Sequence, residues 1–220
     1  MSTIDAAGFY VNPFTAVCMC QQVKSMGQTW MIHTAAASAL GQMMAKTAPR
    51  LGVEVLHIVR REEQAKILYG LGAKHVLVSS KESYADDLKD MVAKNGIRLA
   101  FDALGGGSPS QLMGVLPPGA TVYVYGRLAD SQIGPFGLHD MIYFDKKVEG
   151  FLVTRNLLRQ KGGTKSAAKF VSANFAELFI PPSFTDVPLA ATPKLFVDID
   201  PHNPAAQSVT GKKFRVRPWK

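Results

Sequence analysis

The sequence lacks the features of a membrane-spanning or exported protein. No apolar run reaches the roughly 18 residues that a membrane-spanning helix needs. The first residues, MSTIDAAGFYVNPF, contain the acidic Asp5 and no basic segment ahead of an apolar one, which argues against a signal peptide and an Arg-rich transit peptide. We therefore predict a cytoplasmic location, and a mitochondrial one stays open if the natural chain is longer.

Residues that bind metals or act as nucleophiles are also scarce. The only cysteines are Cys18 and Cys20, and they are too few for a disulfide framework or a structural zinc site. The five histidines are scattered and are expected in core or surface roles: His33, His57, His75, His139 and His202. We predict no metal site, and no residue is identified as catalytic.

The charge is strongly positive, with a net value of +8 and a pI near 9.5. Such a balance is compatible with nucleic acid or with an anionic ligand such as a phosphorylated cofactor. The basic residues are dispersed, and the densest run, GKKFRVRPWK, ends the chain without a nucleic-acid motif. Nucleic acid is therefore the less favoured partner.

Short apolar runs alternate with helical patterns along the first 154 residues. The runs are near-continuous rather than alternating, which is typical of parallel strands covered on both faces. This rhythm predicts an α/β fold, a doubly wound and mostly parallel six-stranded Rossmann sheet. The expected strands lie within residues 29–35, 53–59, 75–80, 97–104, 120–126 and 146–154.

The ends of the chain differ from this repeating part. A helix is expected within residues 7–28, with Asn12 as its N-cap and Pro13 in its first position. After Thr154 the rhythm stops, and an irregular C-terminal extension follows with short helices and one plausible strand at 212–216. We predict a nucleotide-binding domain at 1–160, including the N-terminal helix, and a C-terminal helix and tail at 161–220.

The segment HTAAASALGQ occupies the place of a phosphate-binding turn. The dinucleotide fingerprint G-x-G-x-x-G follows the first strand of such a sheet, and here Ala36, Ser38 and Gly41 stand at its three glycine positions. Backbone N–H groups of Ser38, Ala39 and Leu40 remain available to a pyrophosphate at the helix N-terminus. A small-residue turn used only for packing is the alternative.

Two arginines follow the second strand, about 20 residues beyond that turn. NAD-binding proteins usually place an acidic residue here to hold the ribose 2′-hydroxyl. Arg60 and Arg61 suit a 2′-phosphate instead, through charge-assisted hydrogen bonds. The helix dipole disfavours cations at a helix start, so helix stability does not explain the two arginines at this place. NADPH is therefore the predicted cofactor, and a solvated pair of arginines is the alternative.

Two further strand ends fit a cofactor crevice, because ligands of open α/β sheets lie outside the carboxyl ends of the strands. After the fourth strand, Leu104 and Gly105 offer bare backbone to a ribose or adenine. After the fifth strand, Tyr125 and Gly126 reach the crevice. Each glycine taken alone is equally compatible with an ordinary loop.

A series of motifs resembles the medium-chain dehydrogenase/reductases, and within them the zinc-free branch of quinone oxidoreductases and trans-2-enoyl-thioester reductases. The motifs are NPFTAV, HTAAASALGQ, VRREEQ, LGAKHVL, FDALGG, VYVYGR, GFLVTR and TGKKFRVRP, in the family's order and spacing. The resemblance covers essentially the whole chain and is weaker after Thr154. It implies an NADPH-dependent oxidoreductase that transfers hydride to a quinone or to an activated C=C, such as an enoyl thioester.

The resemblance also assigns roles to individual positions. It implies that Asn12 and Thr15 face the nicotinamide or substrate end of the cleft. It places Phe151 and Leu152 of the sixth strand, with Tyr125 and Gly126, along the nicotinamide. It implies a homodimer paired through the sixth strand, for which a simple edge strand is the alternative.

Members of this family begin with a GroES-like β domain that supplies much of the substrate pocket, and only about ten residues precede NPFTA here. The sequence is therefore interpreted as the cofactor-binding portion of an oxidoreductase acting on a small molecule. The alternative is a catalytically inactive Rossmann module that serves as a nucleotide-binding or scaffold protein in an assembly. The substrate is not identified.

Overall fold

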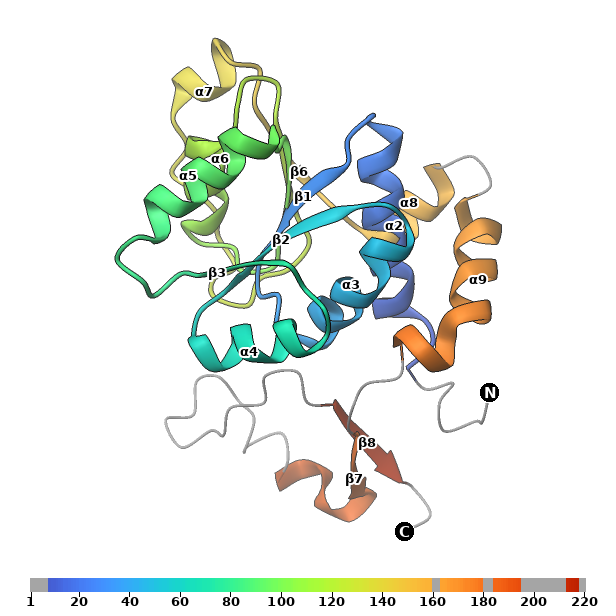
Figure 1. Cartoon of the computed structure of the whole chain (residues 1–220). Helices are drawn as coiled ribbons and strands as arrows, with labels where there is room; N and C mark the ends of the chain where they lie inside the picture. The colour runs from blue at the N-terminus through green and yellow to red at the C-terminus, as the bar shows by residue number, and fades with distance from the viewer. Residues whose placement is uncertain (1–7, 160–162, 180–183, 195–212, 218–220) are drawn as a thin grey trace.

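The computed structural model describes residues 8–159, 163–179, 184–194 and 213–217. Its centre is a six-stranded sheet in the order β3-β2-β1-β4-β5-β6, and every neighbouring pair in it is parallel. This order belongs to the doubly wound dinucleotide-binding fold and confirms the predicted fold class (Figure 1). The strands are β1 Trp30–His33, β2 Glu54–Val59, β3 His75–Val78, β4 Leu99–Asp102, β5 Thr121–Val124 and β6 Lys147–Gly150.

Helices cover both faces of the sheet (Figure 1). One face is packed by α2 (Val11–Ser25), α3 (Ala39–Arg50) and α4 (Glu62–Gly70), and α8 (Val153–Arg159) and α9 (Gly163–Asn174) complete that layer. The other face is packed by α5 (Tyr84–Asn95) and α6 (Ser108–Val115). A short helix, α7 (Leu138–Ile142), precedes β6.

Local sequence explains how α3 is delimited, and α3 is the helix that positions the site. Ser38 is its N-cap, and the Ser38 hydroxyl accepts a hydrogen bond from the N–H of Gly41 at 3.2 Å. Just past its C-cap, Gly52 has a φ of +68°, a left-handed conformation that glycine adopts without strain. The helix is therefore fixed at both ends and starts at the carboxyl end of β1.

The N-terminal helix α2 is buried on several sides, as expected of a helix with apolar residues around much of its circumference. It begins at Val11 with Tyr10 as N-cap, so the predicted start at Asn12 and Pro13 was wrong. Among the described residues no side chain caps this end, which is why the residue types alone placed the start too late. The buried α2 residues pack against α3 and α9 in one core cluster.

The C-terminal part holds more regular structure than predicted. A π-helical turn, Phe175–Phe179, continues α9, and both contribute to the core shared with α2. The predicted strand at 212–216 corresponds to β8 (Lys213–Arg217), which pairs in parallel with an unexpected strand, β7 (Phe184–Pro188). A 3-10 turn at Leu189–Ala191 follows β7. The predicted domain boundary at residue 160 lies outside the described residues and stays a prediction.

Candidate functional site

A cavity of about 350 Å³ opens at the carboxyl ends of the strands. Its walls come from the ends of β4, β5 and β6, from the N-terminus of α3, and from the first turns of α2. This is the place and the size expected for a small-molecule or cofactor site in an open α/β sheet. The lining residues are Val11, Asn12, Thr15, Ser38, Ala39, Leu40, Ala103, Tyr125, Gly126, Leu128, Phe151, Leu152 and Val153.

Nine of the fourteen site residues predicted from the sequence line this cavity. They come from four separate segments of the chain, which the fold brings to one place. The nine are Asn12, Thr15, Ser38, Ala39, Leu40, Tyr125, Gly126, Phe151 and Leu152. The other five, Gly41, Arg60, Arg61, Leu104 and Gly105, are not among the lining residues.

The turn after β1 presents fewer free donors than the sequence suggested. The N–H of Ser38 donates to the carbonyl of Ala35 at 2.9 Å, so it is already used within the turn. Among the described residues, no partner is recorded for the N–H groups of Ala39 and Leu40, the first two of α3. The hydroxyl of Ser38 accepts from Gly41 and keeps its own proton for donation. These three groups form the anion-facing end of the helix.

Gly41 has a packing role rather than a ligand role. A Cβ at this position would lie 2.0 Å from the carbonyl oxygen of Ala36, far inside contact distance. The retained third glycine of the fingerprint therefore allows α3 to approach the turn after β1. Ala35, in that turn, takes a φ of +49°, an uncommon conformation for alanine.

The glycine-rich loop after β4 is organised by Asp102, a residue that the sequence analysis passed over. Its side chain is fully buried and accepts four hydrogen bonds. The donors are the hydroxyls of Thr34 (2.9 Å) and Ser108 (2.6 Å) and the N–H groups of Leu104 (3.0 Å) and Gly105 (2.8 Å). The N–H groups of Leu104 and Gly105 are thus bound to Asp102.

The glycine at position 105 has a structural reason as well. Its φ is +74°, and a Cβ there would lie 2.3 Å from the carbonyl oxygen of Asp130. Ala129 also donates to the carbonyl of Leu104 at 2.8 Å. The loop after β4 therefore packs closely on the segment after β5, and its backbone is less open to a ligand than the sequence suggested.

Tyr125 and Gly126 form the part of the wall that follows β5. A Cβ on Gly126 would lie 2.7 Å from the carbonyl oxygen of Ala103, so a glycine is needed for the two strand ends to meet. The hydroxyl of Tyr125 lies 2.7 Å from Nε2 of His33, and the two rings stack at 5.7 Å with an 8° interplanar angle. Burial, together with the nearby carboxylate of Asp102, raises the pKa of Tyr125 far above its ordinary value.

Arg60 and Arg61 lie exposed between the end of β2 and the start of α4. The side-chain oxygen of Gln64 accepts hydrogen bonds from both of their backbone N–H groups, at 3.0 and 3.1 Å. Among the described residues neither guanidinium has a recorded ion pair or hydrogen bond, so both positive charges are available to a ligand.

Two negative findings concern the described residues only. They contain no helix long and apolar enough to cross a membrane. They also contain no group of three or more His, Cys, Asp or Glu side chains placed to hold a metal ion. The two cysteines are buried, and burial raises the pKa of each thiol to about 12, which makes them poor nucleophiles.

Comparison with known proteins gives a consistent result. Residues 39–171 match the family model described as zinc-binding dehydrogenase. The mitochondrial enoyl-acyl-carrier-protein reductase of Homo sapiens is 30% identical over 160 residues, which are 69% of this chain and 42% of that protein. The 2-haloacrylate reductase of a Burkholderia species is 26% identical over 129 residues, 58% of this chain and 38% of that protein.

Solved structures share the fold over nearly the whole chain. A crystal structure assigned as an NADPH:quinone reductase of Mesorhizobium loti has 27% identity and a TM-score of 0.81, and the match covers 99% of this chain and 62% of that one. The quinone oxidoreductase of Thermus thermophilus, solved with NADPH, has 23% identity and a TM-score of 0.70, over 89% and 62%. The chain spans less than half the length of the curated relatives named above.

Proposed function

Since this chain belongs to the zinc-binding dehydrogenase family, and within it to the zinc-free medium-chain branch of quinone and enoyl reductases, we propose that it is the cofactor-binding portion of an NADPH-dependent oxidoreductase. The substrate class is a quinone or an activated C=C, such as an enoyl thioester. The relatives are named for these reactions: enoyl-thioester reduction, 2-haloacrylate reduction and NADPH:quinone reduction.

The observation that carries the proposal is the cavity at the carboxyl ends of the strands, with the N-terminus of α3 in its wall. The N–H groups of Ala39 and Leu40 and the hydroxyl of Ser38 fit a pyrophosphate, because a helix N-terminus presents donors and positive dipole to an anion. A dinucleotide supplies the hydride when bound. The residues present therefore fit the cofactor.

The remaining side chains of the wall have separable tasks. Tyr125, Phe151 and Leu152 form an apolar wall that excludes water from the reacting end, and Asn12 and Thr15 close the cavity from α2. The hydroxyl of Thr15 donates to the carbonyl of Val11 at 2.7 Å, so its orientation is already fixed. Arg60 and Arg61 are proposed to bind the 2′-phosphate, for which their unpaired charges are the support.

Titration calorimetry tests this proposal directly. We expect the protein to bind NADPH at least about tenfold more tightly than NADH, because charge-assisted hydrogen bonds to a phosphate contribute roughly 1.5–3 kcal/mol. Arg60→Ala/Arg61→Ala removes that preference and leaves NADH binding unchanged.

The matched control for charge is Lys66→Ala/Lys89→Ala, which removes two exposed positive charges from α4 and α5. This control keeps the preference for NADPH. Absence of binding by either dinucleotide at near-millimolar concentration contradicts the whole proposal. Equal binding that the arginine changes do not alter contradicts only the 2′-phosphate assignment.

We extend the proposal to a homodimer paired through β6. This strand is at the edge of the sheet and pairs only with β5 among the described residues. Just before it, α7 exposes Leu138, Ile142 and the adjoining Tyr143, each at least 67% accessible. Exposed apolar side chains beside an unpaired strand edge favour association with a second copy.

A further inference from the structure

Three polar side chains form a row across one face of the sheet, beneath the α2–α3 layer. His33 on β1 and His57 on β2 are direct neighbours in the strand register, and Tyr125 follows β5 on the other side of His33. The surrounding residues of this face are apolar, including Met31, Val55 and Phe101 in its core cluster. We call Tyr125, His33 and His57 the polar row.

The inner end of the polar row reaches the cavity. Tyr125 forms part of the cavity wall, and its hydroxyl lies 2.7 Å from Nε2 of His33. His33 is completely buried, and its other nitrogen, Nδ1, has no hydrogen-bond partner among the described residues. Thus one side of this imidazole is bound to the cavity wall, and the other side faces into the protein unbound.

His57 continues the polar row away from the cavity. Its ring centroid lies 6.5 Å from that of His33, with the rings at 87° to one another. The side chain is 3% exposed, and its Nδ1 also lacks a partner among the described residues. An unsatisfied buried nitrogen costs about 1–3 kcal/mol, so two in adjacent positions call for an explanation other than stability.

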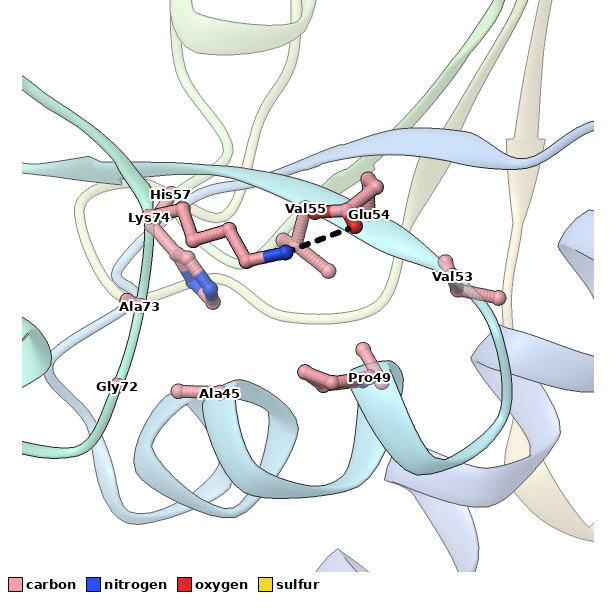
Figure 2. A pocket seen from close by; sticks show the side chains of 10 residues that line it. Ala45, Pro49, Val53, Glu54, Val55, His57, Gly72, Ala73 and Lys74 are labelled. Carbon is pink, nitrogen blue, oxygen red and sulfur yellow. Dashed lines mark hydrogen bonds and ion pairs between the residues drawn. The ribbon is translucent and has the colours of Figure 1, made fainter.

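The outer end of the polar row is a small pocket between β2 and α3. Figure 2 shows the ring of His57 pointing into it, above Ala45 and Pro49 of α3. The pocket has a volume of about 20 Å³, which is enough for one water molecule. Glu54 and Lys74 stand at its rim, joined by an ion pair at 3.3 Å whose side chains are 40% and 67% exposed. The pocket therefore lies beside solvent-exposed charges.

From this arrangement we propose that the polar row is a proton path, running from a water in the pocket beneath α3 through His57 and His33 to Tyr125 in the cavity wall. The path rests on the proposed function, because saturating a C=C consumes one hydride and one proton and the path supplies only the proton. A quinone takes up a proton in the same way.

The transfers balance along the row. The Oη–H bond of Tyr125 breaks as the proton joins the substrate carbon that does not receive the hydride, and Oη recovers a proton from Nε2 of His33. As Nε2 of His33 gives up its proton, Nδ1 of the same ring takes one from His57 by way of a bridging water, and His57 takes one from the water in the pocket. Each ring is then in its other tautomer and returns to the first by rotating about its Cβ–Cγ bond. The net change is one proton taken from solvent.

The protonation states suit this role. Burial lowers the pKa of His33 to about 3 and that of His57 to about 4, each lowered further by a neighbouring histidine, so both rings are neutral at pH 7. A neutral imidazole carries one N–H and one free lone pair, so it can give a proton from one nitrogen while it accepts one at the other. The raised pKa of Tyr125 keeps its hydroxyl protonated between turnovers.

Hydrogen exchange of the His33 ring N–H tests the path without cofactor or substrate. In the ligand-free Tyr125→Phe protein, where the hydroxyl at the cavity end of the row is removed, ¹⁵N NMR is expected to show exchange with water that slows by about tenfold or more when His57→Leu is added. Both ends of the row are then closed, and exchange requires opening of the fold. Ala45→Val fills the pocket without altering either histidine and is expected to slow the exchange as well.

His75→Leu is the matched control, because His75 lies on β3 beside Trp30 and Glu54 and outside the polar row. It is expected to leave the exchange of His33 unchanged. In the Tyr125→Phe background, equal exchange with and without His57→Leu or Ala45→Val overturns the proton path, and so does an equal slowing in His75→Leu.

Turnover provides the second readout and separates the two proposals. With NADPH and an enoyl thioester, His57→Leu is expected to lower kcat by about tenfold or more, to leave KM for NADPH unchanged and to enlarge the solvent deuterium isotope effect. Failure of NADPH to bind contradicts the proposed function, and the exchange measurement still decides whether the path exists. Unchanged kcat in a variant with slowed exchange contradicts the path's part in the reaction.

Discussion

The two faces of the central sheet are built from alternating residues of the same strands, yet they differ in chemistry. Beneath α5 and α6 the buried cluster is apolar, with Ile32, Leu56 and Ile58 among its residues, and the buried carboxylate at its edge, Asp102, accepts four hydrogen bonds. Beneath α2 and α3, the neighbouring positions of β1 and β2 are His33 and His57. Strand propensity and burial are nearly the same on both faces, so backbone structure does not explain why only one face carries the two histidines.

The contrast between the faces marks where the molecule departs from the most stable sequence. Parallel strands covered on both faces are usually apolar throughout, and the α5–α6 face follows that rule. The α2–α3 face keeps two buried imidazoles, each with a nitrogen that has no partner among the described residues, and His33 is hydrogen-bonded to Tyr125 of the cavity wall. Departures of this kind are expected where a protein uses the residues for chemistry, which supports the proposed role of the α2–α3 face.

The largest expected effect is a loss of stability on acidification, caused by His33 and His57 on the α2–α3 face. The pKa of His33 is about 3 and that of His57 about 4 in the folded protein, both below the ordinary 6.5. The contribution of the two neutral histidines to the free energy of unfolding is therefore complete above pH 6.5. It is lost as the pH falls, because the unfolded chain then binds protons at these histidines that the folded chain does not bind. Between pH 7 and pH 4.5 the pair lowers the free energy of unfolding by on the order of 4 kcal/mol.

Urea unfolding at the two pH values measures this loss. His57→Leu is expected to remove about half of it, while the carboxylates common to both proteins contribute equally. If wild type and variant lose the same free energy of unfolding between pH 7 and pH 4.5, the burial of His57 does not control its protonation.

Exchanging residues between the faces gives the next effect in size. Leu56→His places an imidazole in the apolar α5–α6 cluster and is expected to cost about 3 kcal/mol of unfolding free energy at pH 7. His57→Leu, one residue along the same strand, is expected to cost less than about 1 kcal/mol or to stabilise, because it removes an unsatisfied nitrogen. Urea midpoints for both variants decide this. Equal losses of unfolding free energy would mean that the two faces differ in sequence but respond in the same way to an exchange of polar and apolar side chains.

The smallest expected effect concerns Thr47 of α3. It is fully buried, and its hydroxyl has no partner among the described residues. Thr47→Val replaces the hydroxyl with a methyl group of similar size and is expected to change the free energy of unfolding by less than about 1 kcal/mol, towards stabilisation. The exchange rate of the His33 ring N–H is expected to stay at its wild-type value. A marked loss of stability in thermal unfolding would show an unrecognised role for the hydroxyl.

Much of the fold was predictable because its signals are local. Six apolar runs separated by helical patterns sufficed to predict six parallel strands, and each occurs where expected. The start of α2 was not predictable, since tertiary burial rather than a capping side chain determines it. The strand β7 was missed because its pairing with β8 joins segments distant in the sequence.

The candidate site was predictable where ligands are expected at strand ends, and less so where side chains cooperate across strands. The spacing and the family resemblance identified Ser38, Tyr125 and Phe151, which now line one cavity. They did not reveal His33 and His57 as neighbours, because the register of β1 and β2 is a tertiary property. A histidine in each of two successive apolar strands was the available signal.

The four hydrogen bonds accepted by Asp102 join the end of β1, the loop after β4 and the start of α6. Those segments belong to the two halves of the sheet that meet at the cavity. One carboxylate therefore holds both sides of the crevice in register before any ligand arrives. Because the segments beside the crevice are ordered in advance, a ligand that binds there spends less of its binding free energy on ordering the protein.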